Sequence, residues 1–361
     1  MITLLFSSHN GSSTLPAMLE QLTTIHRPQG LRIVAVDNGS SDGTGELLRH
    51  WTQRLPMQVW RLPAATTAQP LASKNRALNF ALDQLAPSLA ASELVVVSDD
   101  DVIPSPDWLT ALLGAADSNP GADVFGGRIV PRWLAPPPAW LDSLQDCFPI
   151  LFATTCATDG ACSSHDVYGP NMAVRGRVFA QGVRFDPRIG PNGTARFGMG
   201  SESELLRRLE RGGHRFVFSE AALVQHQVKP ALLDLAAVLQ RGWRYGFGRA
   251  MMDGQERSRP KMLAAALKDR VLREAKAAAA RLPCFADRRI RLLFWREVAR
   301  GYLEGTLQAP LRVSSVSGSS GGRDAFGAPG SRHRGAQPAR QPPYRAAPAL
   351  PAIARRTIRP S

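Results

Sequence analysis

The chain has 361 residues, of which 44% are hydrophobic and 20% are charged, proportions that are usual for a globular core. Its net charge of +14 lies in the C-terminal part, because residues 1–255 contain 22 Lys/Arg and 23 Asp/Glu, whereas residues 256–361 contain 22 and 7. The first 255 residues therefore lack the charge excess of a nucleic-acid-binding domain, and we predict no nucleic-acid partner.

The cysteines and the N-terminus indicate where in the cell the protein is located. Cys147, Cys156, Cys162 and Cys284 form no C-x-x-C pair, and so few cysteines in a chain of this length favour a reducing environment. The N-terminus has no basic region and too short an apolar run for a signal peptide. No stretch approaches the ~20 apolar residues that span a membrane. We predict a cytoplasmic location, either fully soluble or peripheral at the inner face of the membrane.

Strand-like and helix-like segments alternate through the first hundred residues. The strand-like runs are 2–6, 31–36, 57–62 and 94–97, and the helix-like stretches are 14–25, 43–53 and 71–85. This order predicts an α/β fold with a mainly parallel central sheet flanked by helices. Right-handed crossovers bring the C-terminal ends of such strands to one edge, where ligands bind in open α/β sheets.

The remainder of the chain divides by composition. A helix that ends at Gly212-Gly213 precedes strands at 215–219 and 222–226, and two basic amphipathic helices lie within 259–310. From Ser314 onward the chain is rich in Gly, Ser, Pro and Arg, which is typical of disorder. We predict an α/β domain at 1–230, a basic amphipathic helical extension at 231–312 and a disordered tail at 313–361.

Three adjacent carboxylates, Asp99, Asp100 and Asp101, directly follow the strand predicted at 94–97. They repel one another there, which favours a bound cation. Mg²⁺ or Mn²⁺ takes oxygen ligands and shares them with substrate phosphates. The structural alternative is a solvated acidic turn.

Polar residues near two other strand ends are candidates for binding a nucleotide. Asp37 could accept a hydrogen bond from the imide N–H of uracil, or it could form an Asx-turn or cap the following helix. Asn75 and Arg76, early in the helix after the third strand, could contact ribose or phosphate. Polar positions on a helix surface explain that pair equally well.

A third group of candidates begins the helix at Ser201. Acidic residues suit the positive end of the helix dipole, and Ser201 or Ser203 could cap it. A carboxylate there, on Glu202 or Glu204, could also act as a general base toward an acceptor hydroxyl. His226 is either a metal ligand or a core histidine, and the residue by itself favours the core.

Together, these motifs resemble family 2 glycosyltransferases with the GT-A fold, which are inverting and contain a DxD motif. The resemblance covers about residues 1–250. Its motifs are Ser8-His9-Asn10, Val36–Thr44, Ala72–Ala77, Ser98–Asp101 with Pro104–Leu109, Gly169–Val174, Gly200–Leu205 and His226.

The resemblance implies roles for individual residues. Asp99 and Asp101 would hold the donor diphosphate through Mg²⁺ or Mn²⁺, and His226 would complete the metal coordination. Glu202 would be the catalytic base, although the family usually has Glu-Asp where this chain has Ser201-Glu202, so Glu204 stays a rival. The residues that we assign to substrate binding are Ser8, Asn10, Asp37, Asn75, Arg76, Asp100 and Asn171.

The motifs therefore predict an inverting glycosyltransferase that moves a sugar from a nucleotide-diphosphate sugar, with UDP favoured, to a hydroxyl of a glycan or lipid-linked acceptor. Surface polysaccharide or glycolipid synthesis would need such an enzyme. The basic C-terminal helices fit an anionic membrane surface better than a nucleic acid.

Three other functions would require different motifs or a loss of catalysis. A nucleotidyltransferase that makes nucleotide sugars would carry a basic phosphate loop after the first strand, where this chain has Asn10-Gly11-Ser12-Ser13. A dinucleotide-binding oxidoreductase would carry G-x-G-x-x-G, which is missing. A non-catalytic nucleotide- or glycan-binding protein on the same fold stays open because of the altered Ser201-Glu202 motif.

Overall fold

The computed structural model describes residues 1–62, 73–280 and 288–308, and all of them belong to one compact unit. The tail predicted at 313–361 and Cys284 lie outside the described residues. The division at 230/231 between an α/β domain and a helical extension stays a prediction.

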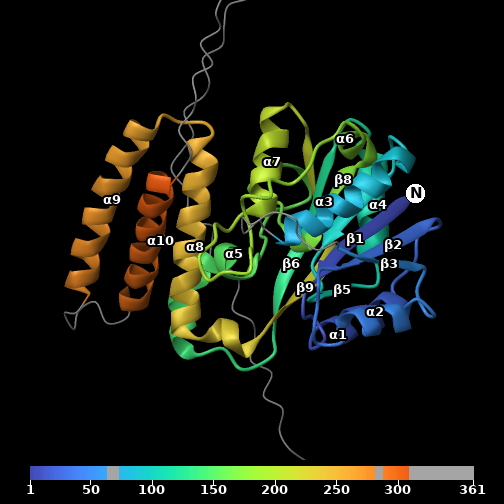
Figure 1. The fold of residues 1–361 in the computed structure, drawn as a ribbon, viewed down its shortest axis with the longest axis horizontal. Coiled ribbons are helices and arrows are strands. Elements are labelled where there is room, and N and C mark those ends of the chain that lie inside the picture. The colour runs from blue at the N-terminus through green and yellow to red at the C-terminus, as the bar shows by residue number, and fades with distance from the viewer. Residues whose placement is uncertain (63–72, 281–287, 309–361) are drawn as a thin grey trace, which may run out of the picture. The chain divides into compact units, whose positions relative to one another are not determined.

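A mixed β-sheet with the strand order β3-β2-β1-β4-β8-β6-β9-β5 forms the centre of the fold, and β7 pairs with β9 (Figure 1). The strands are β1 (Ile2–Ser8), β2 (Leu31–Asp37), β3 (Met57–Arg61), β4 (Leu94–Ser98), β5 (Val102–Pro104), β6 (Val124–Trp133), β7 (Gly160–Cys162), β8 (Met172–Arg175) and β9 (Phe216–Val228). The first four are parallel, as expected from the sequence. The second half is mixed, because β8 runs antiparallel to both β4 and β6 while β6 and β9 are parallel.

The strands predicted at 215–219 and 222–226 are one continuous strand, β9. Its long parallel pairing with β6 continues past the register shift between Gly127 and Arg128 of β6. The prediction of two strands was wrong because the residues between Ser219, which pairs with Gly127, and Leu223, which pairs with Arg128, form a bulge in β9 that shifts the pairing without ending the strand.

Helices cover both faces of the sheet. They are α1 (Leu15–Thr24), α2 (Thr44–Trp51), α3 (Ser73–Leu85), α4 (Trp108–Ser118), α5 (Phe148–Phe152), α6 (Gly176–Ala180), α7 (Ser201–Arg211), α8 (Leu235–Gly254), α9 (Arg259–Ala279) and α10 (Arg289–Gln308). In β1, Leu4 and Phe6 pack with α1, α2 and α4, whereas Leu5 packs with α3, α6 and α7. This alternation follows from the two-residue period of a strand. No helix among the described residues is long and apolar enough to cross a lipid bilayer.

The C-terminal helices pack on one another and on the α/β core. Phe294 of α10 joins Val238 of α8 and Phe152 of α5 in a third hydrophobic cluster. The α8 and α10 backbones approach closely, because a Cβ on Gly246 would lie 2.0 Å from the Val298 carbonyl oxygen. The two helices predicted within 259–310 are present as α9 and α10.

Candidate active site

Three strand ends bring polar residues to one edge of the sheet. In the parallel registers, Ser8 at the end of β1 is paired with Asp37 of β2, and Phe6 is paired with Ser98 of β4. The Ser8 hydroxyl donates a hydrogen bond to Asp100 in the turn after β4. Burial, followed by the charge of a neighbouring aspartate, raises the pKa of Asp100 to about 6. The edge expected from strand order is therefore present and contains the acidic turn.

Lys74 connects two of the candidate carboxylates. Its Nζ lies 2.5 Å from Asp99 Oδ1 and 2.5 Å from Glu202 Oε1, so one ammonium bridges the first turns of α3 and α7 and the end of β4. All three side chains are largely buried, with exposed fractions of 22%, 23% and 18%. The sequence contained Lys74 within a recognised motif but gave no signal that it would meet Glu202, 128 residues away.

The charges in this bridge keep Glu202 ionised. Burial pushes the pKa of Glu202 upward, but the charge of Lys74 and its hydrogen bond hold that pKa below the ordinary value. Burial opposes the charge on Lys74 too, yet Asp99 and Glu202 raise its pKa above the ordinary range. Glu202 is thus in the state in which it can accept a proton.

Asp101 and His226 meet on the other side of the acidic turn. β5 follows Asp101 directly, and its antiparallel pairing with β9 sets Val102 opposite His226. The His226 Nδ1 lies 2.8 Å from the Phe152 carbonyl oxygen and donates to it, because a carbonyl can only accept. The His226 Nε2 then lies 3.4 Å from Asp101 Oδ1. Burial lowers the pKa of His226, but Asp101 more than offsets this and raises it.

The residues at this turn fit a divalent cation by their chemistry. Asp101 Oδ1 is buried and accepts no hydrogen bond from a described residue, although His226 Nε2 is at ion-pair distance. A buried oxygen without a donor is satisfied by a cation, and two carboxylates with an imidazole nitrogen suit Mn²⁺. As positioned in the described parts of the chain, no three His, Cys, Asp or Glu side chains are grouped closely enough to hold a metal ion. The positive charge next to the Asp99 carboxylate is the ammonium group of Lys74.

Arg241 of α8 is a second cation of the site that the sequence did not indicate. Burial lowers its pKa, while Asp101, Asp99 and Glu202 act in the opposite direction through their charges. Its Nε donates to the Ile150 carbonyl oxygen at 3.1 Å, which fixes the side chain. No local pattern could have found Arg241, because only the packing of α8 brings it to the strand ends.

Asp37 and Asn10 lie at the β1 and β2 ends of the same edge. Asp37 is buried and accepts a hydrogen bond from the Ser40 backbone N–H at 3.0 Å, while Arg61 Nε lies 4.0 Å from its other oxygen. The exposed Asn10 accepts a hydrogen bond from the Ser41 N–H at 2.9 Å and so ties the two loops together. Asp42, two residues before the first residue of α2, accepts hydrogen bonds from the Thr44 N–H and hydroxyl.

Two predicted substrate-binding residues have their hydrogen bonds inside the protein. The fully buried Asn75 donates to the carbonyl oxygens of Asp186 and Ile189. The fully buried Asn171 donates to Arg128 and Ala222 carbonyl oxygens and accepts from the Trp108 indole at 2.8 Å. These contacts give both residues a packing role, while the buried Asn75 Oδ1 has no hydrogen-bond partner among the described residues. Substrate binding by Asn75 and Asn171 stays a prediction. Arg76, in the same turn of α3 as Asn75, is partly exposed and stays a prediction.

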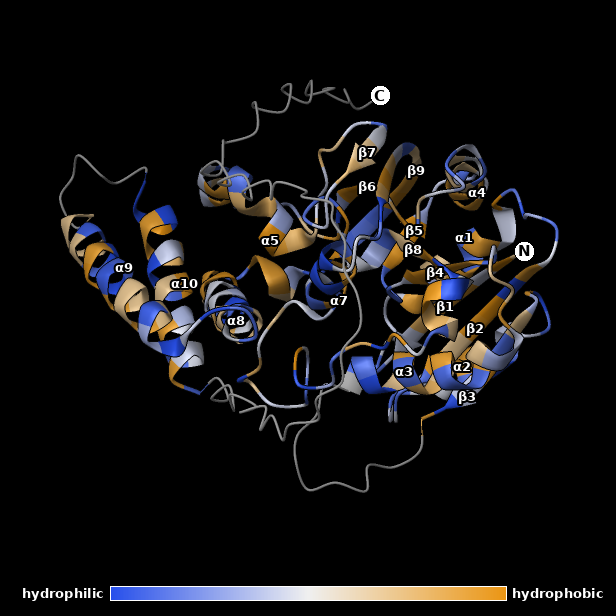
Figure 2. Ribbon diagram, turned by 90° about the horizontal axis from the view of Figure 1, so that it is seen from above, coloured by the Kyte–Doolittle hydropathy of each residue, from blue (hydrophilic) through white to orange (hydrophobic). Residues whose placement is uncertain are grey.

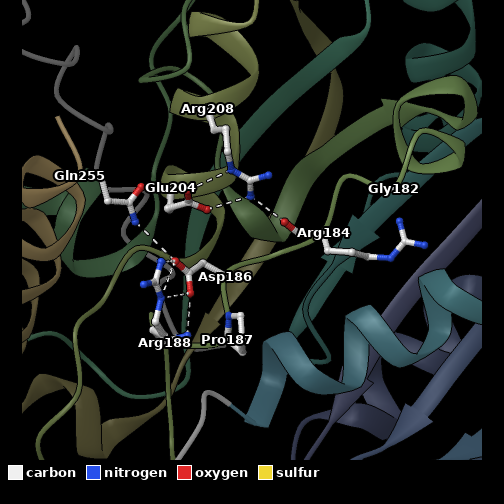
Figure 3. Close-up of a pocket in the computed structure, with 8 residues that line it drawn as sticks. All are labelled: Gly182, Arg184, Asp186, Pro187, Arg188, Glu204, Arg208 and Gln255. Atoms are coloured by element: carbon white, nitrogen blue, oxygen red, sulfur yellow. Dashed lines mark hydrogen bonds and ion pairs between the residues drawn. The ribbon is translucent and has the colours of Figure 1, made fainter. Parts of the chain in front are cut away.

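Glu204, the rival base, faces away from the acidic turn. Both of its carboxylate oxygens are bound by Arg208, at 3.1 and 3.0 Å (Figure 3). It lines a separate cavity of about 450 Å³ together with Gly182, Arg184, Asp186, Pro187, Arg188, Arg208 and Gln255. The first turn of α7 thus sends Glu202 toward Asp99 and Glu204 toward an arginine.

Comparison with known proteins identifies the family. The sequence model described as "Glycosyltransferase like family 2" matches residues 2–247. The chain belongs to this family. The resemblance in the sequence motifs is therefore confirmed, and the GT-A fold is confirmed with it.

Two relatives and one solved structure are similar to this family-2 chain. It is 25% identical over 186 residues to a glucosyl-dolichyl phosphate glucuronosyltransferase of Haloferax volcanii, covering 50% of this chain and 57% of that protein. It is 23% identical over 240 residues to succinoglycan biosynthesis protein ExoM of Rhizobium meliloti, covering 64% and 69%. A mannosyltransferase from Pyrobaculum calidifontis, solved with GDP-Man and Mn²⁺, shares the fold, with a TM-score of 0.52 at 16% identity over 84% of this chain and 86% of that one.

Proposed function

We propose that the chain is an inverting glycosyltransferase that moves a sugar from a UDP-sugar to an acceptor hydroxyl. The observation that carries this proposal is the position of Glu202, ionised and joined through Lys74 to Asp99 at the end of β4. Family membership supports the reaction class.

Glu202 would act as the general base. Its carboxylate takes the proton of the acceptor hydroxyl while the hydroxyl oxygen bonds to the anomeric carbon of the sugar. The bond from that carbon to the phosphate oxygen breaks on the opposite face, so the configuration inverts and the nucleoside diphosphate leaves.

The donor would bind along the strand ends. Asp37, at the end of β2, would accept a hydrogen bond from the base, and Ser8 donates a hydrogen bond to Asp100 after β4. Asp99, Asp101 and His226 would hold Mg²⁺ or Mn²⁺, which supplies positive charge to the departing diphosphate. Arg241 adds a fixed cation beside the same carboxylates and would bind a diphosphate oxygen. The Mn²⁺ and GDP-Man in the mannosyltransferase of the same fold support a metal and a nucleotide-sugar donor.

The acceptor would be a glycan or a lipid-linked sugar. This rests on the names of the two relatives, one acting on glucosyl-dolichyl phosphate and the other in succinoglycan biosynthesis. We place the reaction in surface polysaccharide or glycolipid synthesis.

Calorimetric titration with UDP, GDP, dTDP and a panel of UDP-sugars, with and without Mn²⁺, tests the donor site. We expect metal-dependent UDP binding that Asp101→Ala abolishes and that Asp107→Ala, which removes an exposed carboxylate on α4, leaves intact. Binding of GDP in place of UDP would correct the base preference. Failure of all three nucleotides under every metal condition would overturn the transferase assignment, and UDP-sugar binding without any product would favour a non-catalytic binding protein.

A further inference from the structure

The helix α9 has one packed face and one exposed face. It packs against α10, and in the views of Figures 1 and 2 it lies on the far side of α10 from the sheet. Its buried residues are Met262, Ala266 and Ala277. Leu267, Val271 and Leu272 are 49%, 69% and 47% exposed, and they lie close together on one helix instead of being scattered singly.

Lysines accompany these aliphatic residues. Lys261, Lys268 and Lys276 are exposed. At about 100° per residue, the three lie within about 80° of one another around the helix axis. We call the set Lys261, Leu267, Lys268, Val271, Leu272 and Lys276 the α9 face. Figure 2 shows the mixture of hydrophilic and hydrophobic residues along α9.

The acidic residues of α9 do not neutralise this face. Asp269 is paired with Arg273 at 3.2 Å, and Glu274 is paired with Arg270 at 2.5 Å, so each carboxylate is matched by an arginine of the same helix. Arg273 also lies over the Trp295 ring of α10, and Arg270 donates to the Arg296 carbonyl oxygen. The arginines thus hold α9 to α10, and the three lysines leave the α9 face positive.

We propose that the α9 face binds an anionic lipid surface. Exposed Leu and Val bordered by Lys around the exposed part of a helix have the composition of a helix that lies in the membrane interface, with apolar side chains in the acyl boundary. Lysine ammonium groups extend along their aliphatic stems to reach lipid phosphates. Each lysine near such a surface adds electrostatic attraction that salt weakens.

The positive charge of the α9 face favours an anionic bilayer over two other occupants, a second copy of the chain and the chain's own C-terminal residues. A second copy of the chain would bring lysines against lysines. The C-terminal residues 313–361 contain eight Arg and one Asp, so they carry the same sign as the α9 face. An anionic bilayer is complementary to the charge and to the apolar side chains together.

Co-sedimentation of the full chain with vesicles tests this proposal, and it requires no turnover, so its result is independent of the proposed transferase activity. We expect binding to vesicles of phosphatidylcholine with 30% phosphatidylglycerol, weakened by salt, and little binding to phosphatidylcholine alone. Lys261→Gln/Lys268→Gln/Lys276→Gln should reduce partitioning on the order of a hundredfold. Leu267→Ser/Val271→Ser should reduce it on the order of tenfold.

The control variants change matched side chains away from α9. Leu134→Ser removes an exposed leucine near the end of β6, and Arg27→Gln removes an exposed cation beyond α1. Both should bind vesicles as the wild type does. The proposal is overturned if the wild-type chain ignores anionic vesicles, or if the α9 variants bind like the controls. A dimer in light scattering that Leu267→Ser/Val271→Ser dissociates would assign the α9 face to a second copy instead.

Discussion

Arg207 of α7 and Asp253 of α8 form a buried ion pair, with both guanidinium Nη atoms 3.2 Å from Asp253 Oδ1. The other oxygen of Asp253 accepts a hydrogen bond from the Tyr302 hydroxyl of α10 at 2.9 Å. One carboxylate, 2% exposed, therefore ties the helix that carries Glu202 to two helices of the C-terminal extension.

Removing this carboxylate should destabilise the whole described unit. Asp253→Ala leaves Arg207 with Glu256 as its remaining carboxylate partner and removes the acceptor of the Tyr302 hydroxyl, so we expect a loss of about 2 kcal/mol in the free energy of unfolding. Tyr302→Phe should lower the free energy of unfolding by about 1 kcal/mol, since it removes one hydrogen bond. Urea denaturation followed by circular dichroism measures both. Asp142→Ala, at an exposed position, is the control and should change stability by less than about 0.5 kcal/mol. If Asp253→Ala and Asp142→Ala changed the free energy of unfolding equally, Asp253 would not hold α7, α8 and α10 together.

The two glutamates of α7 should differ in their effect on turnover. Glu202→Gln keeps the shape but cannot accept the proton, so kcat should fall by about 10² to 10⁴ while UDP binding persists. Glu204→Gln disturbs the Arg208 pair and should lower stability with a much smaller effect on kcat. Steady-state kinetics on the preferred UDP-sugar with both variants decides between them. A larger loss of kcat in Glu204→Gln would move the base to Glu204.

The pH dependence of turnover should reveal the influence of Lys74. A base works only when deprotonated, so activity falls as the pH drops through its pKa, and the lowered pKa of Glu202 sets that fall below the ordinary range of a glutamate. In Lys74→Met the lysine charge is lost and burial remains, so the acid limb of kcat/KM should move toward neutral pH. Arg27→Met, which removes an exposed cation beyond α1, is the control. Identical acid limbs in wild type and Lys74→Met would show that Lys74 does not control the base.

The cysteines should differ in reactivity. Burial is the main cause that raises the pKa of Cys147 to about 12 and that of Cys162 to about 12, and the charge of a nearby aspartate adds to it in each case. Thiolate is the reactive form, so at pH 8 both should be alkylated slowly, whereas the exposed Cys156 should react readily. Iodoacetamide labelling of a Cys284→Ser variant, followed by peptide mass spectrometry, gives the three rates. Labelling of Cys147 at the rate of Cys156 would mean that the 139–152 region opens in solution.

Local features of the sequence were enough for the first half of the fold and for part of the site. The apolar runs that became β1, β2, β3 and β4 are short and bounded by polar turns, and their alternation with helices sets the parallel order. Strand ends in such a sheet meet at one edge, so Ser8, Asp37 and the acidic turn at Asp99–Asp101 could be located without coordinates. Family membership followed from the same motifs.

Only the tertiary structure decided which polar atoms face the site and which face the protein. Asn75 and Asn171 are as polar as Asn10, but backbone carbonyls that come from distant segments use their amide groups, and no local pattern carries that information. Lys74 and Arg241 entered the site because α3 packs against β1 and β2 and α8 packs against α5, which brings both cations to carboxylates far away in the chain. Sequence spacing determines which element carries a charge, whereas burial and long-range packing determine which opposite charge it meets.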